Sequence, residues 1–155
     1  MMRYAFVAPP GWARAPFPPP QIGVYLRAPV APGPDSASIL LFDGVAAAGT
    51  LSDHLDAFVS QSTEGLKAKA QKPAAVKSAA YPGLAVQLTT QVTGATGKSR
   101  DEVRVYVLFD AGGTRLPVAF VGGPKALAAH QKAFDALLAS IAPLDTATLH
   151  RAWAE

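Results

Sequence analysis

Phe6-Val7-Ala8-Pro9-Pro10-Gly11-Trp12 is the most distinctive stretch of this 155-residue chain. An apolar run ends on two prolines and a glycine, and a tryptophan follows at once. Proline fixes φ and donates no backbone hydrogen bond, so the run predicts a short strand, Tyr4 to Val7, that stops at a turn. The place of Trp12 directly after this turn favours a lid over the core, with an exposed partner-binding anchor as the alternative.

The composition is typical of a globular protein. Half of the residues are hydrophobic and only 16% are charged, and the length suits one domain spanning residues 1–155. The absence of cysteine excludes disulfides, thiol catalysis and cysteine-ligated zinc. The net charge of +3 is weakly basic, and we expect no nucleic-acid partner. The nearest approach to a basic cluster is expected to be a solvated helix end and linker: Lys67, Lys69, Lys72 and Lys77.

The first half of the chain predicts loops, two further strands and one helix. Prolines are dense between Pro9 and Pro34 and predict mostly loop, interrupted by a strand over 23–28. The apolar run 37–42 is typical of a strand covered on both faces. Apolar residues at helical spacing from Leu51 to Leu66 predict a helix, with Thr50 or Ser52 as its N-cap, Lys67 and Lys69 at its far end and Pro73 as its limit.

The second half predicts an antiparallel meander closed by a helix. Apolar and polar residues alternate over 84–93 and from Val103 to Phe109, a period of two that indicates half-buried strands. The polar loop 94–101 and the turn at 112–113 are short, as connections between antiparallel neighbours are. The other expected elements are a strand over 75–80, a turn over 81–83, a strand over 116–121, a helix from Pro124 that ends by Pro143, and a short final helix over 146–153.

Each of the two long helices has a single apolar stripe, which must be buried against another part of the protein. An α+β domain satisfies both helices: an antiparallel sheet of about six strands, flanked by helices in an α/β/α sandwich.

The motif Phe6-x-x-Pro9-x-Gly11-Trp12, followed by this order of elements, resembles the PsbP-like superfamily. That superfamily includes a photosystem II extrinsic subunit, a Ran-binding nuclear import factor, bacterial periplasmic lipoproteins and the Eag-type chaperones of type VI secretion. The resemblance implies the fold and a non-catalytic protein-binding role, and it supplies no catalytic residues. The proline-rich insertion 16–20 and the alanine-rich helices depart from the family pattern.

The motifs that suggest chemistry have ordinary structural explanations. The segment 94–99 ends in Gly-Lys-Ser like a phosphate-binding loop, but Val92 stands where that motif needs glycine and a strand is expected to follow. His54, His130 and His150 are not paired at metal-ligand spacing, and no Gly-x-Ser-x-Gly occurs. We therefore predict no catalytic residue, no metal ligand and no cofactor.

These observations predict a non-catalytic protein-binding module, such as a bacterial secretion chaperone or adaptor of the Eag type. A sheet face left open by the helices is the expected groove, and the candidate contact residues are Trp12, Phe17 and Tyr25. One alternative is a small-ligand-binding protein or hydrolase with a pocket under the proline-rich loop. Another is an envelope-associated structural protein. The segment Pro16 to Pro20 favours a stiff surface loop over a polyproline docking segment.

The expected partner is another protein, and a homodimer is left open. No apolar run is long enough to span a membrane, and the N-terminus lacks the pattern of a signal peptide. We therefore expect a cytoplasmic protein, or a periplasmic one if a signal was removed.

Overall fold

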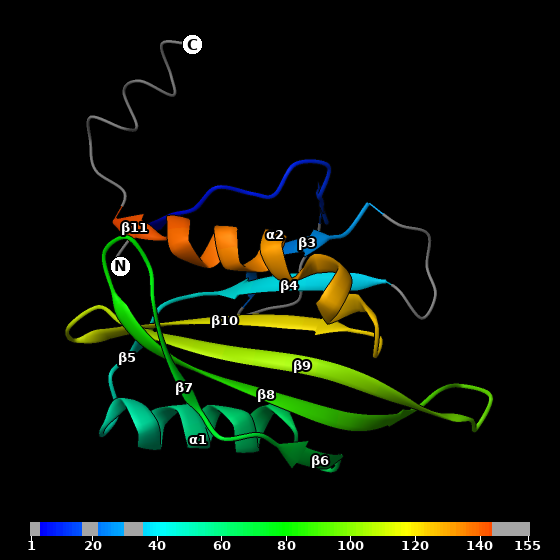
Figure 1. The fold of residues 1–155 in the computed structure, drawn as a ribbon. Coiled ribbons are helices and arrows are strands. Elements are labelled where there is room, and N and C mark those ends of the chain that lie inside the picture. The colour runs from blue at the N-terminus through cyan, green and yellow to red at the C-terminus, as the bar shows by residue number, and fades with distance from the viewer. Residues whose placement is uncertain (1–3, 17–21, 30–35, 144–155) are drawn as a thin grey trace.

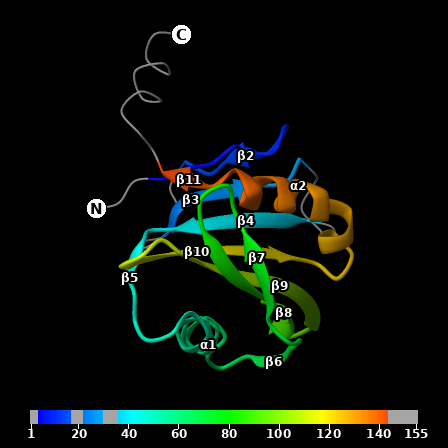
Figure 2. The same ribbon diagram turned by 60° about the vertical axis from the view of Figure 1, so that its left-hand side comes forward.

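The computed structural model describes residues 4–16, 22–29 and 36–143. A large sheet lies between two helices, one on each face (Figures 1 and 2). In chain order, the described elements are β1 (Tyr4–Ala5), β2 (Ala13–Arg14), β3 (Ile22–Arg27), β4 (Ala37–Phe42), β5 (Val45–Ala46), α1 (Leu51–Ser62), β6 (Lys67–Ala70), β7 (Ala74–Lys77), β8 (Pro82–Thr93), β9 (Ser99–Asp110), β10 (Thr114–Gly122), α2 (Ala126–Ser140) and β11 (Ala142–Pro143).

The sheet is antiparallel and, within the described residues, has nine strands. Its main path runs β2-β3-β4-β10-β9-β8-β6, while β5 pairs with β10 and β7 with β8. The predicted α+β sandwich is confirmed, but the sheet is larger than the expected six strands. The short edge strands β2 and β6 are fully exposed. A strand without a buried side has no alternation of apolar and polar residues by which the sequence could reveal it.

One face of the sheet, the α2 face, is covered by α2. Phe134 of this helix is buried against Phe120 of β10, with ring centroids 5.4 Å apart. The same cluster takes Ile39 from β4 and Val107 from β9. This is the larger of the two hydrophobic cores, and it fixes α2 across the middle of the sheet.

The opposite face, the α1 face, is covered by α1 mainly over β8 and β9, with a further contact from Phe58 to Phe42 of β4. Leu55 is buried there with Leu88 and Leu108. Phe58 stands edge-on to both Phe42 and Tyr106, at centroid distances of 5.3 and 5.5 Å. The predicted alternation in β8 and β9 therefore divides their side chains between two cores, one under each helix.

The end of α1 differs from the expectation. The helix begins after the Thr50 N-cap but stops at Ser62, and Gly65 then adopts a φ of 78° in the turn that follows. Glycine is the residue that takes this left-handed conformation without strain. Lys67 and Lys69 consequently lie in β6 and not at a helix end, which corrects the prediction made from their position.

Other boundaries also shift: the strand expected over 75–80 is β7, which ends at Lys77, and the loop expected over 94–101 ends where β9 begins, at Ser99. α2 begins at Ala126, with Lys125 as its N-cap, so Pro124 is not its first residue; a turn in which the amide of Ala126 donates to the carbonyl of Gly123 comes first. Pro82 and Gly83 already belong to β8, where they pair with β7 and β9. The final helix expected over 146–153 lies outside the described residues.

The opening corner forms as expected, although its strand is shorter. Gly11 adopts a φ of 81°, and the amide of Trp12 donates to the carbonyl of Pro9. The indole of Trp12 packs against the α2 core and stands edge-on to His130, with centroids 5.3 Å apart. β1 pairs with β11 and not with the main sheet, so the segment before the corner is held to the residues that follow α2.

Candidate functional site

The uncovered part of the α1 face forms a groove, which we call the α1-face groove. It lies beside α1, over β3, β4, β9 and β10, and has a volume of about 310 Å³. Its lining is mostly apolar or aromatic: Tyr25, Leu40, Phe42, Ser62, Arg104, Tyr106, Ala119 and Val121.

The strand register explains why these side chains meet. Directly paired residues of neighbouring strands point to the same face of a sheet. One row across the strands joins Tyr106, Ala119, Leu40 and Tyr25, each paired with the next. α1 packs mainly on β8 and β9, so Tyr25 of β3, Leu40 of β4 and Val121 of β10 are left half-buried.

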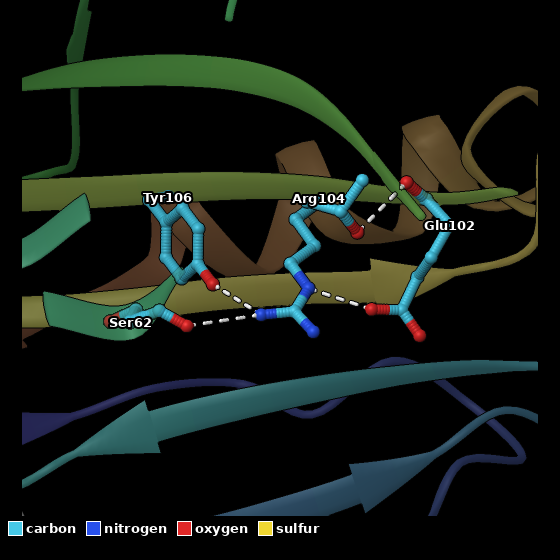
Figure 3. A network of polar contacts seen from close by, with 5 residues as sticks. Ser62, Glu102, Arg104 and Tyr106 are labelled. Carbon is cyan, nitrogen blue, oxygen red and sulfur yellow. Dashed lines mark hydrogen bonds and ion pairs between the residues drawn. The ribbon is translucent and has the colours of Figure 1, made fainter. Parts of the chain in front are cut away.

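A polar network centred on Arg104 lines the groove beside the end of α1 (Figure 3). The Arg104 guanidinium donates to Glu102 at 2.6 Å, to the hydroxyl of Tyr106 at 3.0 Å and to the carbonyl of Ser62 at 3.3 Å. Burial lowers the pKa of Arg104, but its hydrogen bonds to Tyr106 and Glu102 act the other way and leave the pKa above its usual value. Arg104 is thus a fixed cation that ties the last residue of α1 to β9.

The groove continues into a smaller polar hollow of about 190 Å³. Tyr25 and Val121 line both spaces, so the two are contiguous. The Arg27 guanidinium lies 5.6 Å from the ring centroid of Tyr25, within the range of a cation–π contact. The hollow adds the side chains or backbone of Ser36, Ser38, Arg100, Asp101, Glu102, Gly122 and Gly123. The apolar floor therefore has a charged and hydroxyl-bearing rim.

The last residue of α1, Ser62, lines the groove, and the start of the same helix is anchored by Arg115 of β10. Its side chain is almost fully buried and pairs with Asp110 at 3.2 Å. It also donates to the carbonyl of Gly49 at 3.2 Å and contacts Nδ1 of His54 at 3.4 Å. The Thr50 hydroxyl accepts from the amide of Asp53 and caps the helix. Two contacts of this guanidinium, to Gly49 and His54, thus hold the first turn of α1 on the sheet, while the pair with Asp110 of β9 fixes the guanidinium in place.

We expect acid to weaken this anchor through His54. Burial and the nearby Arg115 charge lower the pKa of His54 below its ordinary value of 6.5. As the pH falls through 6.5, the unfolded chain therefore binds this proton before the folded chain does, and the free energy of unfolding decreases. Urea unfolding between about pH 7.5 and 5.5 should show a larger loss of stability for the natural chain than for His54→Gln. Equal losses would contradict this role for His54.

Of the three candidate contact residues, the two that the structure describes, Tyr25 and Trp12, do not lie together. Tyr25 lines the groove, at the junction of its apolar and polar parts. Trp12 packs on the α2 core, on the other side of the sheet. Phe17 lies outside the described residues. The sequence did not single out Arg104 or Tyr106, although a signal was present: Glu102, Arg104 and Tyr106 alternate with valines along β9.

The Gly-Lys-Ser segment lies between two strands, as the sequence predicted. Residues 94–98 form a hairpin connection between β8 and β9 in which the amide of Gly94 donates to the carbonyl of Lys98, and Ser99 already begins β9. Within residues 4–16, 22–29 and 36–143, no three His, Cys, Asp or Glu side chains gather as metal ligands do. His150 lies outside those ranges. None of the described helices is long and apolar enough to cross a membrane.

No protein-family model matches the sequence, and no curated protein does either. Solved structures do match. The Ran-binding protein Mog1p of Saccharomyces cerevisiae aligns with a TM-score of 0.65 at 14% identity, over 96% of this chain and 99% of that one. Cyanobacterial PsbP from Synechocystis aligns with a TM-score of 0.57 at 15% identity, over 91% of this chain and 86% of that one. The chain has the PsbP/Mog1-like fold.

A third structure with this fold is LpqN, involved in cell envelope biogenesis of Mycobacterium tuberculosis. It aligns with a TM-score of 0.58 at 12% identity, over 92% of this chain and 83% of LpqN. The resemblance to the PsbP-like superfamily, inferred from the Phe6 to Trp12 corner and the order of elements, is thus confirmed as a fold. At these identities the comparisons establish the fold alone, and the roles named for the three proteins remain theirs.

Proposed function

We propose that this PsbP/Mog1-like chain is a non-enzymatic module that binds another protein through the α1-face groove. The observation that carries the proposal is the open sheet face itself: aromatic and aliphatic side chains stand half-buried there, beside a fixed Arg104 network. Tyrosine, other aromatic residues and arginine are enriched at protein interfaces, where they contribute much of the binding energy.

The shape of the groove suggests how a partner is held. Leu40, Ala119 and Val121 form a floor that suits one aliphatic or aromatic side chain. Tyr25, Arg104 and Glu102 lie around it, and their polar groups can hydrogen-bond to the backbone of an inserted segment. Because Arg104 is already tied to α1 and to Glu102, little conformational entropy is lost when it contacts a partner.

The fold comparison gives independent support. Mog1p, which has the same fold over nearly its whole length, is described as a Ran-binding protein, so this scaffold is able to serve a protein partner. A narrower form of the proposal makes the partner a secreted protein and this chain its chaperone or adaptor. Co-expression tests it: the chain should raise the soluble yield of a secreted protein encoded beside its gene, and a groove variant should not.

The test of the general proposal is Leu40→Arg, with Val45→Arg as the matched control. Leu40 lies on the floor of the groove, whereas Val45 is 40% exposed on β5 and does not line it. Tagged chains are recovered from the native host, and bound proteins are quantified. A partner of the natural chain should persist with Val45→Arg and fall about ten-fold or more with Leu40→Arg, because an unpaired charge in an apolar contact is costly.

Thermal melts establish that Leu40→Arg is folded, and Val121→Lys replaces it if it is not. Long basic side chains keep their charge in water by extending along apolar surface, so the free fold should tolerate either change. A folded groove variant that retains the same partners at the same level would refute the proposal.

A further inference from the structure

β6 is an open edge of the sheet. It is the last strand on the path from β2, and in both views no described element lies beyond it (Figures 1 and 2). All four of its residues, Lys67 to Ala70, are exposed. An edge strand of this kind presents unpaired backbone groups that another extended segment can use.

The register identifies which backbone groups are free. β6 pairs with β8 so that Lys67 faces Gln91 and Lys69 faces Thr89, and the same register continues to Gln71, whose amide donates to the carbonyl of Gln87. Hydrogen-bonded and non-hydrogen-bonded pairs alternate in an antiparallel ladder. Lys67, Lys69 and Gln71 therefore direct their backbone groups toward β8. Ala68 and Ala70 direct theirs outward, where small side chains leave access to them.

Two positively charged side chains lie next to the free backbone groups of β6. Lys67 and Lys69 lie on the same side of the strand and line a hollow of about 430 Å³ with Thr89, Gln91 and Asp101. Neither lysine forms an ion pair with a described carboxylate, since the two ion pairs of the described residues belong to Arg104 and Arg115. Edge lysines are known to keep sheets from pairing with one another, and the same charges attract a strand of opposite sign.

We propose that β6 binds an extended acidic segment of another protein, which adds to the sheet as a further strand. The segment's backbone pairs with the outward groups of Ala68 and Ala70. Carboxylates at alternate positions of the segment lie across from Lys67 and Lys69, at the short distance of direct cross-strand neighbours. The free peptide groups favour a polypeptide over an anionic membrane or a nucleic acid, because those ligands use the lysines but have no strand to pair.

A second copy of this chain suits the edge poorly. Two β6 strands that pair would bring four lysines together, and like charges across a strand pair are destabilising. The acidic segment is the occupant that the charge favours. The hollow beside Lys67 and Lys69 shares no lining residue with the α1-face groove, so either proposal can fail without the other.

The test uses a fluorescent peptide of about eight residues that alternates threonine and glutamate, a pattern suited to a strand with one acidic side. The natural chain should bind it, more weakly as salt is added. Lys67→Glu with Lys69→Glu should lower the affinity about ten-fold or more. Lys125→Glu with Lys132→Glu is the matched control, since it makes the same change in net charge at exposed positions in and beside α2.

Ala68→Pro separates strand addition from plain charge attraction. It removes an outward backbone N–H while leaving both lysines and the ladder to β8 in place, and edge strands accept proline at such positions. Strand addition predicts that this variant also loses the peptide. In the natural chain, the amides of Ala68 and Ala70 should become protected from hydrogen exchange when the peptide is bound, a readout that needs no substitution.

Three results would overturn the proposal. One is peptide binding that survives Ala68→Pro in a folded chain, or that leaves the two alanine amides unprotected. Another is an equal loss of affinity in the Lys125 and Lys132 control. The third is binding of anionic lipid vesicles or of DNA at least as tight as that of the peptide, with the same dependence on Lys67 and Lys69.

Discussion

Replacement of Phe134 by alanine is expected to lower the free energy of unfolding by about 3–5 kcal/mol, the usual cost of emptying a fully buried phenylalanine site. Phe134 is only 1% exposed, and its ring contacts that of Phe120 across the α2 core. The cost arises from lost burial and from the cavity that remains, since β4, β9 and β10 form a rigid floor that cannot collapse into it. Urea unfolding of the two chains measures the difference.

Lys132→Ala is the control for this variant, because Lys132 is exposed on the same helix. Surface substitutions of this kind change stability by less than about 0.5 kcal/mol. A loss below about 1 kcal/mol for Phe134→Ala would mean that α2 does not cover the sheet as described.

Arg115→Met is expected to cost about 2–3 kcal/mol, although methionine keeps much of the apolar stem. The variant leaves the carbonyl of Gly49 and the carboxylate of Asp110 without their partner. Breaking a fully buried ion pair costs more, but Asp110 is about a third exposed and can regain water. The loss should concentrate at the first turn of α1, where hydrogen exchange of the amides should accelerate.

Arg100→Met provides the comparison, since Arg100 is exposed at the start of β9. It should leave both the stability and the exchange of α1 unchanged. If Arg115→Met also left the stability and the hydrogen exchange of α1 unchanged, the contacts of Arg115 with Asp110, Gly49 and His54 would not be what holds α1.

The sequence predicted the scaffold because two of its patterns are unambiguous. These patterns are the alternation of apolar and polar residues in β8 and β9 and the apolar stripe of α1 and α2. Each pattern arises because one side of the strand or helix is buried, and both long strands and both helices are buried on at least one side. β6 shows where such reading fails. Its residues are all exposed, so no apolar alternation marks it as a strand, and its lysines resembled the charged end of a helix. The turn at Gly65 is what redirects the chain.

The groove was predicted only in outline. An uncovered sheet face was expected, and Tyr25 was named, but its lining comes from four strands and one helix that are distant in the sequence. Arg104, Tyr106 and Leu40 meet through strand register, which a single sequence does not specify. Trp12 shows the opposite case. Its position in the sequence is distinctive, but its side chain packs on the α2 core and does not line the groove.

Photocrosslinking from the floor of the groove tests the account most directly. Benzoylphenylalanine is placed at position 40 in the native host, with position 45 on exposed β5 as the comparison. If the α1-face groove is a protein-binding surface, illumination should yield a discrete adduct with another protein from position 40 and none from position 45. No adduct from position 40, or the same adducts from both positions, would contradict it.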